Sequence, residues 1–214
     1  MDEINKLFAT PLYRVTLGDV EALNASLEKR ILSLENEEHR KKNSPQPMPA
    51  TVFESEFDFL KRPEPEVIEL RDILYASLAS FVKEVNALTD EQLAKLKFGN
   101  HCWFHVTRDG GYFQPHNHPN ASWSLVYYVN PGDVVPKNDA AAGHIVFHDP
   151  RPQAAYYQDP ANGGMIRDYS YSGVRIRPTP GELLIFPSYL MHHVEPYEGE
   201  APRITVAANF WFHT

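Results

Sequence analysis

The chain has 214 residues with a net charge of −8, 43% hydrophobic residues, 12% aromatic residues and a single cysteine. This length fits one domain that buries a substantial core. The excess of acidic residues argues against a nucleic-acid-binding protein, because such proteins usually carry a stripe of basic residues. It also gives little reason to expect binding to an anionic membrane.

Cysteine content and the N-terminal segment bear on the compartment. The lone Cys102 excludes an internal disulfide framework and fits a reducing environment. The first residues, MDEINKLFATPLYRV, lack the basic and apolar regions of a signal peptide. No run of about eighteen apolar residues predicts a membrane span. We therefore expect a cytoplasmic protein.

The first 97 residues favour helices. Residues 7–17 predict a short strand, and apolar residues at three- and four-residue steps predict a helix within 18–41. The clearest amphipathic stripe spans 65–87, with a proline in the first turn. Thr89 and Gln92 resemble a capping box that opens a third short helix.

From about residue 98 the pattern changes to short apolar runs separated by Gly, Pro, Asn and Asp. These runs are 100–107, 122–129, 143–148, 173–178, 181–187, 189–194 and 203–212. Many short strands with turn signals predict a barrel or sandwich. The aromatic segment 152–172 predicts a long irregular loop. We expect one structural domain, in which an N-terminal strand and helices (1–97) pack on a β core (98–214).

Two histidine-rich segments stand far apart in the chain. His116 and His118 are two residues apart, so on an extended backbone their side chains share a face. The following proline favours that extended geometry. His192 and His193 are adjacent, so on a strand their side chains point to opposite faces. At most one of them can therefore bind the same metal as His116 and His118. The alternation of side chains along a strand does not show which one. Because imidazole binds iron, zinc, copper or nickel, the pattern predicts a metalloenzyme.

Longer motifs accompany these histidines in the second half of the chain. They are PHNHP at 115–119, SLVYYV at 124–129, FHDPR at 147–151, GELLIFPS at 181–188, LMH at 190–192 and a late arginine, Arg203. Together they resemble a bacterial and phage family of 2-oxoglutarate/Fe(II)-dependent oxygenases. The resemblance implies a mainly β protein with N-terminal helices, built on a double-stranded β-helix, which is a cupin-like jelly-roll.

The resemblance also implies roles in metal binding. His116 and His192, rather than His193, would be ligands of Fe(II). Most members of the superfamily carry a carboxylate where this chain has His118. His118 replaces that carboxylate, or Asp149 ligates instead, or His118 stays outside the coordination shell and water or an anion fills the position. We favour ligation by His118, because its spacing places it where the acid would be.

Cosubstrate binding is assigned to a late strand. The resemblance implies that Arg203 binds the distal carboxylate of 2-oxoglutarate, since a planar guanidinium grips a carboxylate through two hydrogen bonds. Thr205 would share the face of Arg203 and add a hydroxyl. The alternative for Arg203 is a surface ion pair with Glu198 or Glu200.

The remaining site assignments rest on position. Tyr127 and Tyr128 alternate faces, so one of them can line the pocket, and we assign Tyr127 to the cosubstrate. Arg151, Tyr157 and Arg167 are predicted to contact the prime substrate. No catalytic side chain beyond the metal ligands is expected.

The resemblance implies hydroxylation of an unknown prime substrate, with O₂ consumed and 2-oxoglutarate converted to succinate and CO₂. Two alternatives remain open. One is a cupin-like three-histidine dioxygenase or isomerase that does not use 2-oxoglutarate. The other is a jelly-roll binding module without catalysis. Jelly-roll sheets also pair into dimers, so a homodimer is an allowed assembly.

Overall fold

The structure is a computed structural model that describes residues 4–44, 47–133 and 141–214. In chain order the elements are β1 (Tyr13–Thr16), α1 (Glu21–Ser33), β2 (Val52–Glu54), a 3₁₀ turn (Phe59–Lys61), α2 (Pro65–Val85), α3 (Asp90–Lys95), β3 (Lys97–Thr107), β4 (Phe113–His116), β5 (Trp123–Asn130), β6 (Ile145–Phe147), a second 3₁₀ turn (Pro152–Ala155), β7 (Val174–Ile176), β8 (Glu182–Pro187), β9 (His192–Val194) and β10 (Arg203–His213).

Two antiparallel sheets face each other and form a double-stranded β-helix. The larger sheet has the strand order β1-β8-β5-β10-β3-β2, and the smaller has the order β4-β9-β6-β7. From β3 to β10 the chain alternates between the two sheets, except that β6 and β7 form an antiparallel pair within the smaller sheet, and this is the winding of a jelly-roll. The predicted fold class is therefore confirmed.

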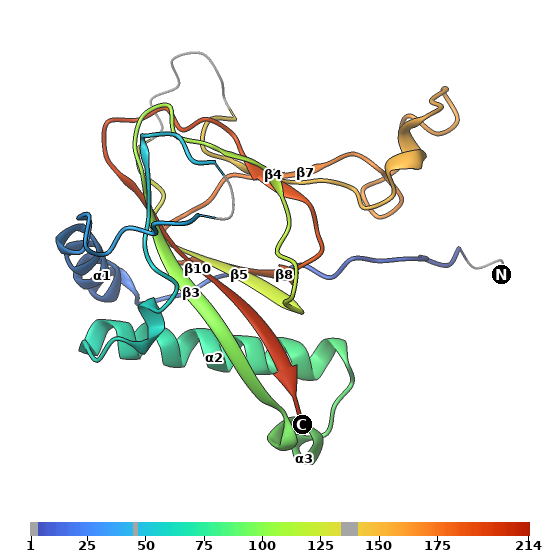
Figure 1. Cartoon of the computed structure of the whole chain (residues 1–214). Coiled ribbons are helices and arrows are strands. Elements are labelled where there is room, and N and C mark those ends of the chain that lie inside the picture. Colours follow the sequence, from blue (N-terminus) through green and yellow to red (C-terminus); the bar gives the residue numbers. More distant parts are fainter. Residues whose placement is uncertain (1–3, 45–46, 134–140) are drawn as a thin grey trace.

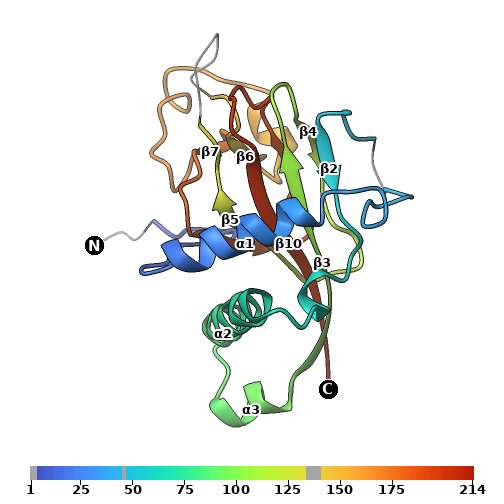
Figure 2. The ribbon, with the colours of Figure 1, turned by 90° about the vertical axis from the view of Figure 1, so that its left-hand side faces the viewer.

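Helices α1 and α2 cover the outer face of the larger sheet, as Figures 1 and 2 show. α2 buries one stripe of apolar side chains: Val67, Leu70, Leu74, Leu78, Phe81 and Val82. α3 begins at the predicted capping box, in which Thr89 and Gln92 cap each other's backbone N–H groups. None of the described helices combines the length and apolar character that crossing a bilayer requires.

Strand alternation divides the interior into two cores. One core lies between the helices and the larger sheet, and the other lies between the two sheets. On β10, Ile204 and Val206 enter the first core, while Arg203 and Thr205 face the space between the sheets. The same period-two rule applies along β3 and β5, so these strands of the larger sheet pack against the helices with one face and line the inner space with the other.

The predicted strands of the core are found, with two additions. β2 pairs with β3, and β4 pairs with β9, although neither short run was predicted as a strand. The predicted helix within 18–41 is confined to α1. The segment 152–172 is irregular apart from one 3₁₀ turn and projects from the smaller sheet (Figure 1).

Candidate metal and cosubstrate site

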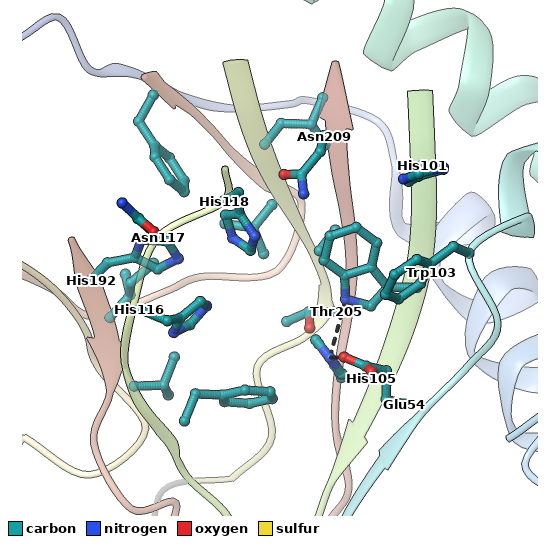
Figure 3. A pocket seen from close by; sticks show the side chains of 18 of the residues that line it. Glu54, His101, Trp103, His105, His116, Asn117, His118, His192, Thr205 and Asn209 are labelled. Atoms are coloured by element: carbon teal, nitrogen blue, oxygen red, sulfur yellow. Dashed lines mark hydrogen bonds and ion pairs between the residues drawn. The ribbon is translucent and has the colours of Figure 1, made fainter. Parts of the chain in front are cut away.

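A cavity of about 380 Å³ opens between the two sheets. Its walls carry His116, His118 and His192 from one side and Arg203 and Thr205 from the other. Figure 3 shows the three imidazoles grouped at β4 and β9, facing Thr205 across the pocket. The two histidine-rich segments of the sequence therefore meet at one wall.

The three imidazoles are close enough to share one metal ion. One ring nitrogen from each of His116, His118 and His192 lies within 4.8 Å of the other two. Strand register produces this grouping, because His116 stands directly opposite His192 in the β4–β9 pair. The ring centroids of His116 and His192 are 4.3 Å apart, and His118 lies 5.1 Å from each.

Hydrogen bonds fix the orientation of two of these rings. Nδ1 of His116 lies 2.7 Å from the carbonyl oxygen of Gln114, and Nδ1 of His192 lies 2.8 Å from that of Leu190. A carbonyl only accepts, so each Nδ1 carries the proton and each Nε2 keeps its lone pair. Metal-binding histidines are commonly oriented in this way.

The electrostatics of the cluster favour neutral rings. Burial lowers the pKa of His116, lowers that of His118 to about 3, and lowers that of His192 well below its usual value. Neutral imidazoles present free lone pairs near neutral pH, which metal binding requires. The donor set therefore fits a divalent transition metal that accepts nitrogen ligands.

The structure separates His192 from its neighbour His193. His193 points to the other face of β9, where its Nδ1 lies 2.8 Å from Nε2 of His148. Asp149 does not join the three-histidine group, because its carboxylate accepts from the Arg151 guanidinium at 2.8 Å and lines a different cavity. This arrangement supports the interpretation that His118 takes the place of the usual carboxylate.

The lowered pKa of His118 has a measurable consequence for the metal-free protein. Below about pH 6.5 the unfolded chain takes up a proton at His118 that the folded chain refuses until about pH 3, so stability falls as pH falls through that window. We expect His118→Leu to flatten the slope of unfolding free energy against pH by at most about 1.4 kcal/mol per pH unit. Urea denaturation at a series of pH values measures the slope. The exposed-site variant His213→Gln should keep it, and equal slopes in all three proteins would refute the expectation.

Arg203 is a buried cation on the opposite wall. The residue is 2% exposed, and its Nε atom has no hydrogen-bond partner among the described residues. Burial lowers the pKa of its guanidinium, which nevertheless stays charged at neutral pH. The burial is incompatible with the alternative of a surface ion pair to Glu198 or Glu200. A buried cation without a bound acid is a site for an anionic ligand.

Two side chains complete this wall. Thr205 is 2% exposed and lies on the face of Arg203, as predicted. Tyr128, fully buried, also lines the cavity, and the centroid of its ring lies 5.3 Å from the guanidinium carbon of Arg203. The Tyr128 hydroxyl lacks a hydrogen-bond partner within the described chain, and burial raises its pKa to about 12.

The structure places Tyr127 away from the cavity. Its hydroxyl donates to Oδ1 of Asn24 on α1 at 2.6 Å, in the core between helices and sheet. The predicted alternation of the two tyrosines is thus observed, but Tyr128 is the one that faces the cavity. Sequence parity could not decide between them, because both faces of β5 are buried.

Conservative substitutions should separate the roles of the two tyrosines. Tyr127→Phe leaves the buried Asn24 oxygen unpaired, so we expect a loss of about 1–3 kcal/mol of unfolding free energy with unchanged affinity for 2-oxoglutarate. Tyr128→Phe should instead weaken 2-oxoglutarate binding by about tenfold. Chemical denaturation and calorimetric titration measure the two effects. The reverse assignment of effects would show that Tyr127 is the cosubstrate residue.

The predicted substrate contacts do not lie in the three-histidine cavity. Arg151 and Arg167 line a second cavity of about 620 Å³, formed with the N-terminal segment and the strand ends of the smaller sheet. Tyr157 is 71% exposed on the projecting loop. None of these three residues therefore lies in the cavity that contains His116, His118, His192 and Arg203.

Neither Glu54 nor His105 was assigned to the site from the sequence. Both line the three-histidine cavity, and Oε2 of Glu54 lies 3.0 Å from Nε2 of His105. One signal was available for Glu54. It directly follows the apolar pair Val52 and Phe53, so it lies beside residues of types that are usually buried.

Comparisons with known proteins agree with the fold. Solved structures that resemble the chain include a prolyl-4-hydroxylase of Pseudomonas putida (TM-score 0.56, 14% identity, covering 96% of this chain and 94% of that one). Another is a prolyl hydroxylase of Trichoplax adhaerens in complex with a hypoxia inducible factor peptide fragment (0.57, 15%, 96% and 86%). A third is HygX of Streptomyces hygroscopicus with nickel, 2-oxoglutarate and hygromycin B bound (0.52, 13%, 94% and 82%). At these identities the likeness establishes the fold alone.

The sequence comparisons establish the family. No curated protein matches the chain. The model of the family described as "Putative 2OG-Fe(II) oxygenase" matches residues 101–209, just over half of the 214-residue chain. That stretch contains all three clustered histidines together with Arg203 and Thr205. The chain therefore belongs to the 2OG-Fe(II) oxygenases and is an enzyme that depends on Fe(II) and 2-oxoglutarate.

Proposed function

We propose that His116, His118 and His192 hold Fe(II), and that Arg203 with Thr205 and Tyr128 holds the distal carboxylate of 2-oxoglutarate. One observation carries this assignment. A cluster of three neutral imidazoles faces, across one cavity, a buried guanidinium whose Nε has no hydrogen-bond partner among the described residues. A dicarboxylic cosubstrate supplies one carboxylate for the metal and a second carboxylate for the arginine.

Each part of the cavity has a distinct task. The three histidines would hold the metal, His116 and His192 through the Nε2 atoms that their hydrogen bonds leave free, and Arg203 would orient the far end of the cosubstrate. Apolar side chains such as Ile145, Phe186 and Val194 line the remaining wall and keep water out. When bound, iron and 2-oxoglutarate supply oxidative decarboxylation to succinate and CO₂ with O₂, coupled to oxygenation of the prime substrate.

The prime substrate is a small molecule or a peptide.

Four further properties are proposed: the exclusion of nucleic acid, the compartment, the assembly and the domain organisation. The net charge of −8 supports a substrate other than nucleic acid. The single buried cysteine supports a cytoplasmic location, and the facing sheets permit a homodimer. The pairing of β1 with β8 and of β2 with β3 supports one structural domain rather than two.

Anaerobic titration with Fe(II), with and without 2-oxoglutarate, tests the proposal. We expect stoichiometric iron binding and, only in the presence of 2-oxoglutarate, the weak visible charge-transfer band of the chelate. If iron binds but no band appears, the three-histidine site performs other chemistry, as in a cupin-like enzyme without 2-oxoglutarate. If no metal binds, the histidines serve packing and the metal assignment is wrong.

A further inference from the structure

The three-histidine cavity contains a charge that the metal and the cosubstrate do not use. Among the side chains that line it, Arg203 is the cation and Glu54 is the carboxylate. Glu54 lies on β2, outside the residues that the family model matches. Figure 3 places it with His105 and Trp103 on the side of the pocket opposite His116 and His192.

Glu54 is buried and poorly paired. The residue is 6% exposed, and its Oε1 atom has no hydrogen-bond partner among the described residues. Lys41, whose backbone N–H donates to the carbonyl oxygen of Glu54, directs its side chain to Glu56 at 2.9 Å instead. Within the described parts of the chain, the side-chain hydrogen bond of the Glu54 carboxylate is the contact of Oε2 with Nε2 of His105, at 3.0 Å.

That ring nitrogen already has another partner. The indole Nε1–H of Trp103 donates to Nε2 of His105 at 3.1 Å. Indole N–H is a donor only, and a ring nitrogen offers either one hydrogen or one lone pair. When Nε2 of His105 accepts from Trp103, it has no hydrogen to give to Glu54. The carboxylate is then left without a donor, which is costly for a buried charge.

The surroundings of Glu54 suit an organic cation. The rings of Trp103 and Phe57 pack with centroids 4.8 Å apart, and His105 packs on Phe113 at 4.6 Å. Aromatic faces attract an ammonium group and bury the carbon atoms attached to it. An ammonium donates several N–H bonds, so it can satisfy both oxygens of Glu54 while Trp103 keeps its bond to His105.

We propose that Glu54 recognises a primary ammonium group on the prime substrate, with an apolar carbon frame held against the aromatic wall. The inference rests on the proposed function, since it names the substrate class of the same site. The ammonium end would bind opposite the histidines, so a carbon atom further along the frame faces the metal. The ammonium belongs to a free amine or to a lysine side chain of a peptide, because both present the same chemistry to Glu54.

Three matched probes test the charge preference: cyclohexylmethylamine, cyclohexylmethanol and cyclohexanecarboxylate. Each is added anaerobically to the complex with Fe(II) and 2-oxoglutarate after its visible band has formed. The shift of the band and calorimetric titration report binding. We expect the amine to bind at least about tenfold more tightly than the other two. N-acetyl-lysine methylamide and its norleucine counterpart then distinguish a peptide side chain from a free amine.

Variants assign that preference to Glu54. Glu54→Gln should bind the three probes with similar affinity while still forming the band, which also shows that the variant is folded. Glu56→Gln, a matched change outside the cavity, should keep the preference for the amine. If Glu54→Gln fails to form the band, Glu54→Met is used in place of Glu54→Gln. The methionine removes both the charge and the hydrogen bond of Glu54.

Several outcomes overturn the inference. Equal binding of the alcohol and the amine would mean that Glu54 carries a proton. Tighter binding of the carboxylate would mean that His105 is a charged donor. Absence of binding by the amine at millimolar concentration, or an unchanged preference in Glu54→Gln, also refutes it. All of these results leave the band of the native protein intact. Failure of the native protein to form the band refutes the proposed function, and the inference falls with it.

Discussion

Replacing His192 by alanine is expected to abolish stoichiometric iron binding, whereas His193→Gln leaves iron binding intact. His192 is 4% exposed, its ring is held by the Leu190 carbonyl, and it stands opposite His116. Removal of a direct ligand should cost more than the roughly 10- to 100-fold in affinity that the loss of an outer hydrogen-bond partner costs. Anaerobic equilibrium dialysis followed by metal analysis measures the change.

The paired variants make the result specific to one side chain. His192 and His193 are neighbours on β9, so a general disturbance of the strand would affect both variants alike. Retained iron binding in His192→Ala, or a loss in His193→Gln that matches it, would contradict the assignment. His118→Ala in the same assay tests the third ligand. We expect a comparable loss, and unchanged affinity would leave that coordination position to water or an anion.

Arg203→Met is expected to remove 2-oxoglutarate binding while leaving iron binding unchanged. Truncating one partner of a buried charge pair costs about 2–5 kcal/mol, which corresponds to a rise in Kd of about 30-fold or more. The cosubstrate-free protein should become more stable, because methionine fills similar space without an unpaired buried charge. Titration calorimetry and thermal unfolding, with and without 2-oxoglutarate, measure both effects.

The control for this variant is Arg175→Met. Arg175 pairs with Glu195 at 3.3 Å on the outside of the smaller sheet, so its loss should leave both ligands bound as before. In the native protein and this control, 2-oxoglutarate should raise the unfolding temperature by mass action. An equal rise in Arg203→Met would show that another cation binds the cosubstrate.

The fold was largely predictable because its signals are local. Short apolar runs bounded by Gly, Pro, Asn and Asp predicted most core strands, and the capping box at Thr89 and Gln92 appears as predicted. The strands β2 and β4 were missed because their sequences, VFE and FQPH, mix apolar residues with a charged residue, polar residues or proline and so form no apolar run. Their position depends on tertiary pairing with β3 and β9.

The site was predictable where spacing or resemblance identified residues. The grouping of His116, His118 and His192 agrees with the prediction, as does the shared face of Arg203 and Thr205. The choice between Tyr127 and Tyr128 could not be made, because both faces of β5 are apolar environments and the sequence does not show which sheet face is inner. That choice needed the packing of α1 on the sheet.

Long-range contacts explain the remaining differences. Glu54 reaches the cavity only because β2 pairs with β3, and nothing in its neighbouring sequence specifies that partner. Arg151 and Arg167 were assigned by closeness in sequence to a motif. The loop carries them to the second cavity instead.

The adjacent His192 and His193 affect the fidelity of strand pairing during folding. A slip of β9 by one residue would turn His193 inward in place of His192, so an imidazole would still face His116. Metal binding therefore discriminates poorly between the two registers. The neighbouring residues discriminate well, since the slip would expel Val194 from the inner core and bury the Glu195 carboxylate. The apolar residue beside the ligands, rather than the ligands themselves, selects the correct alignment.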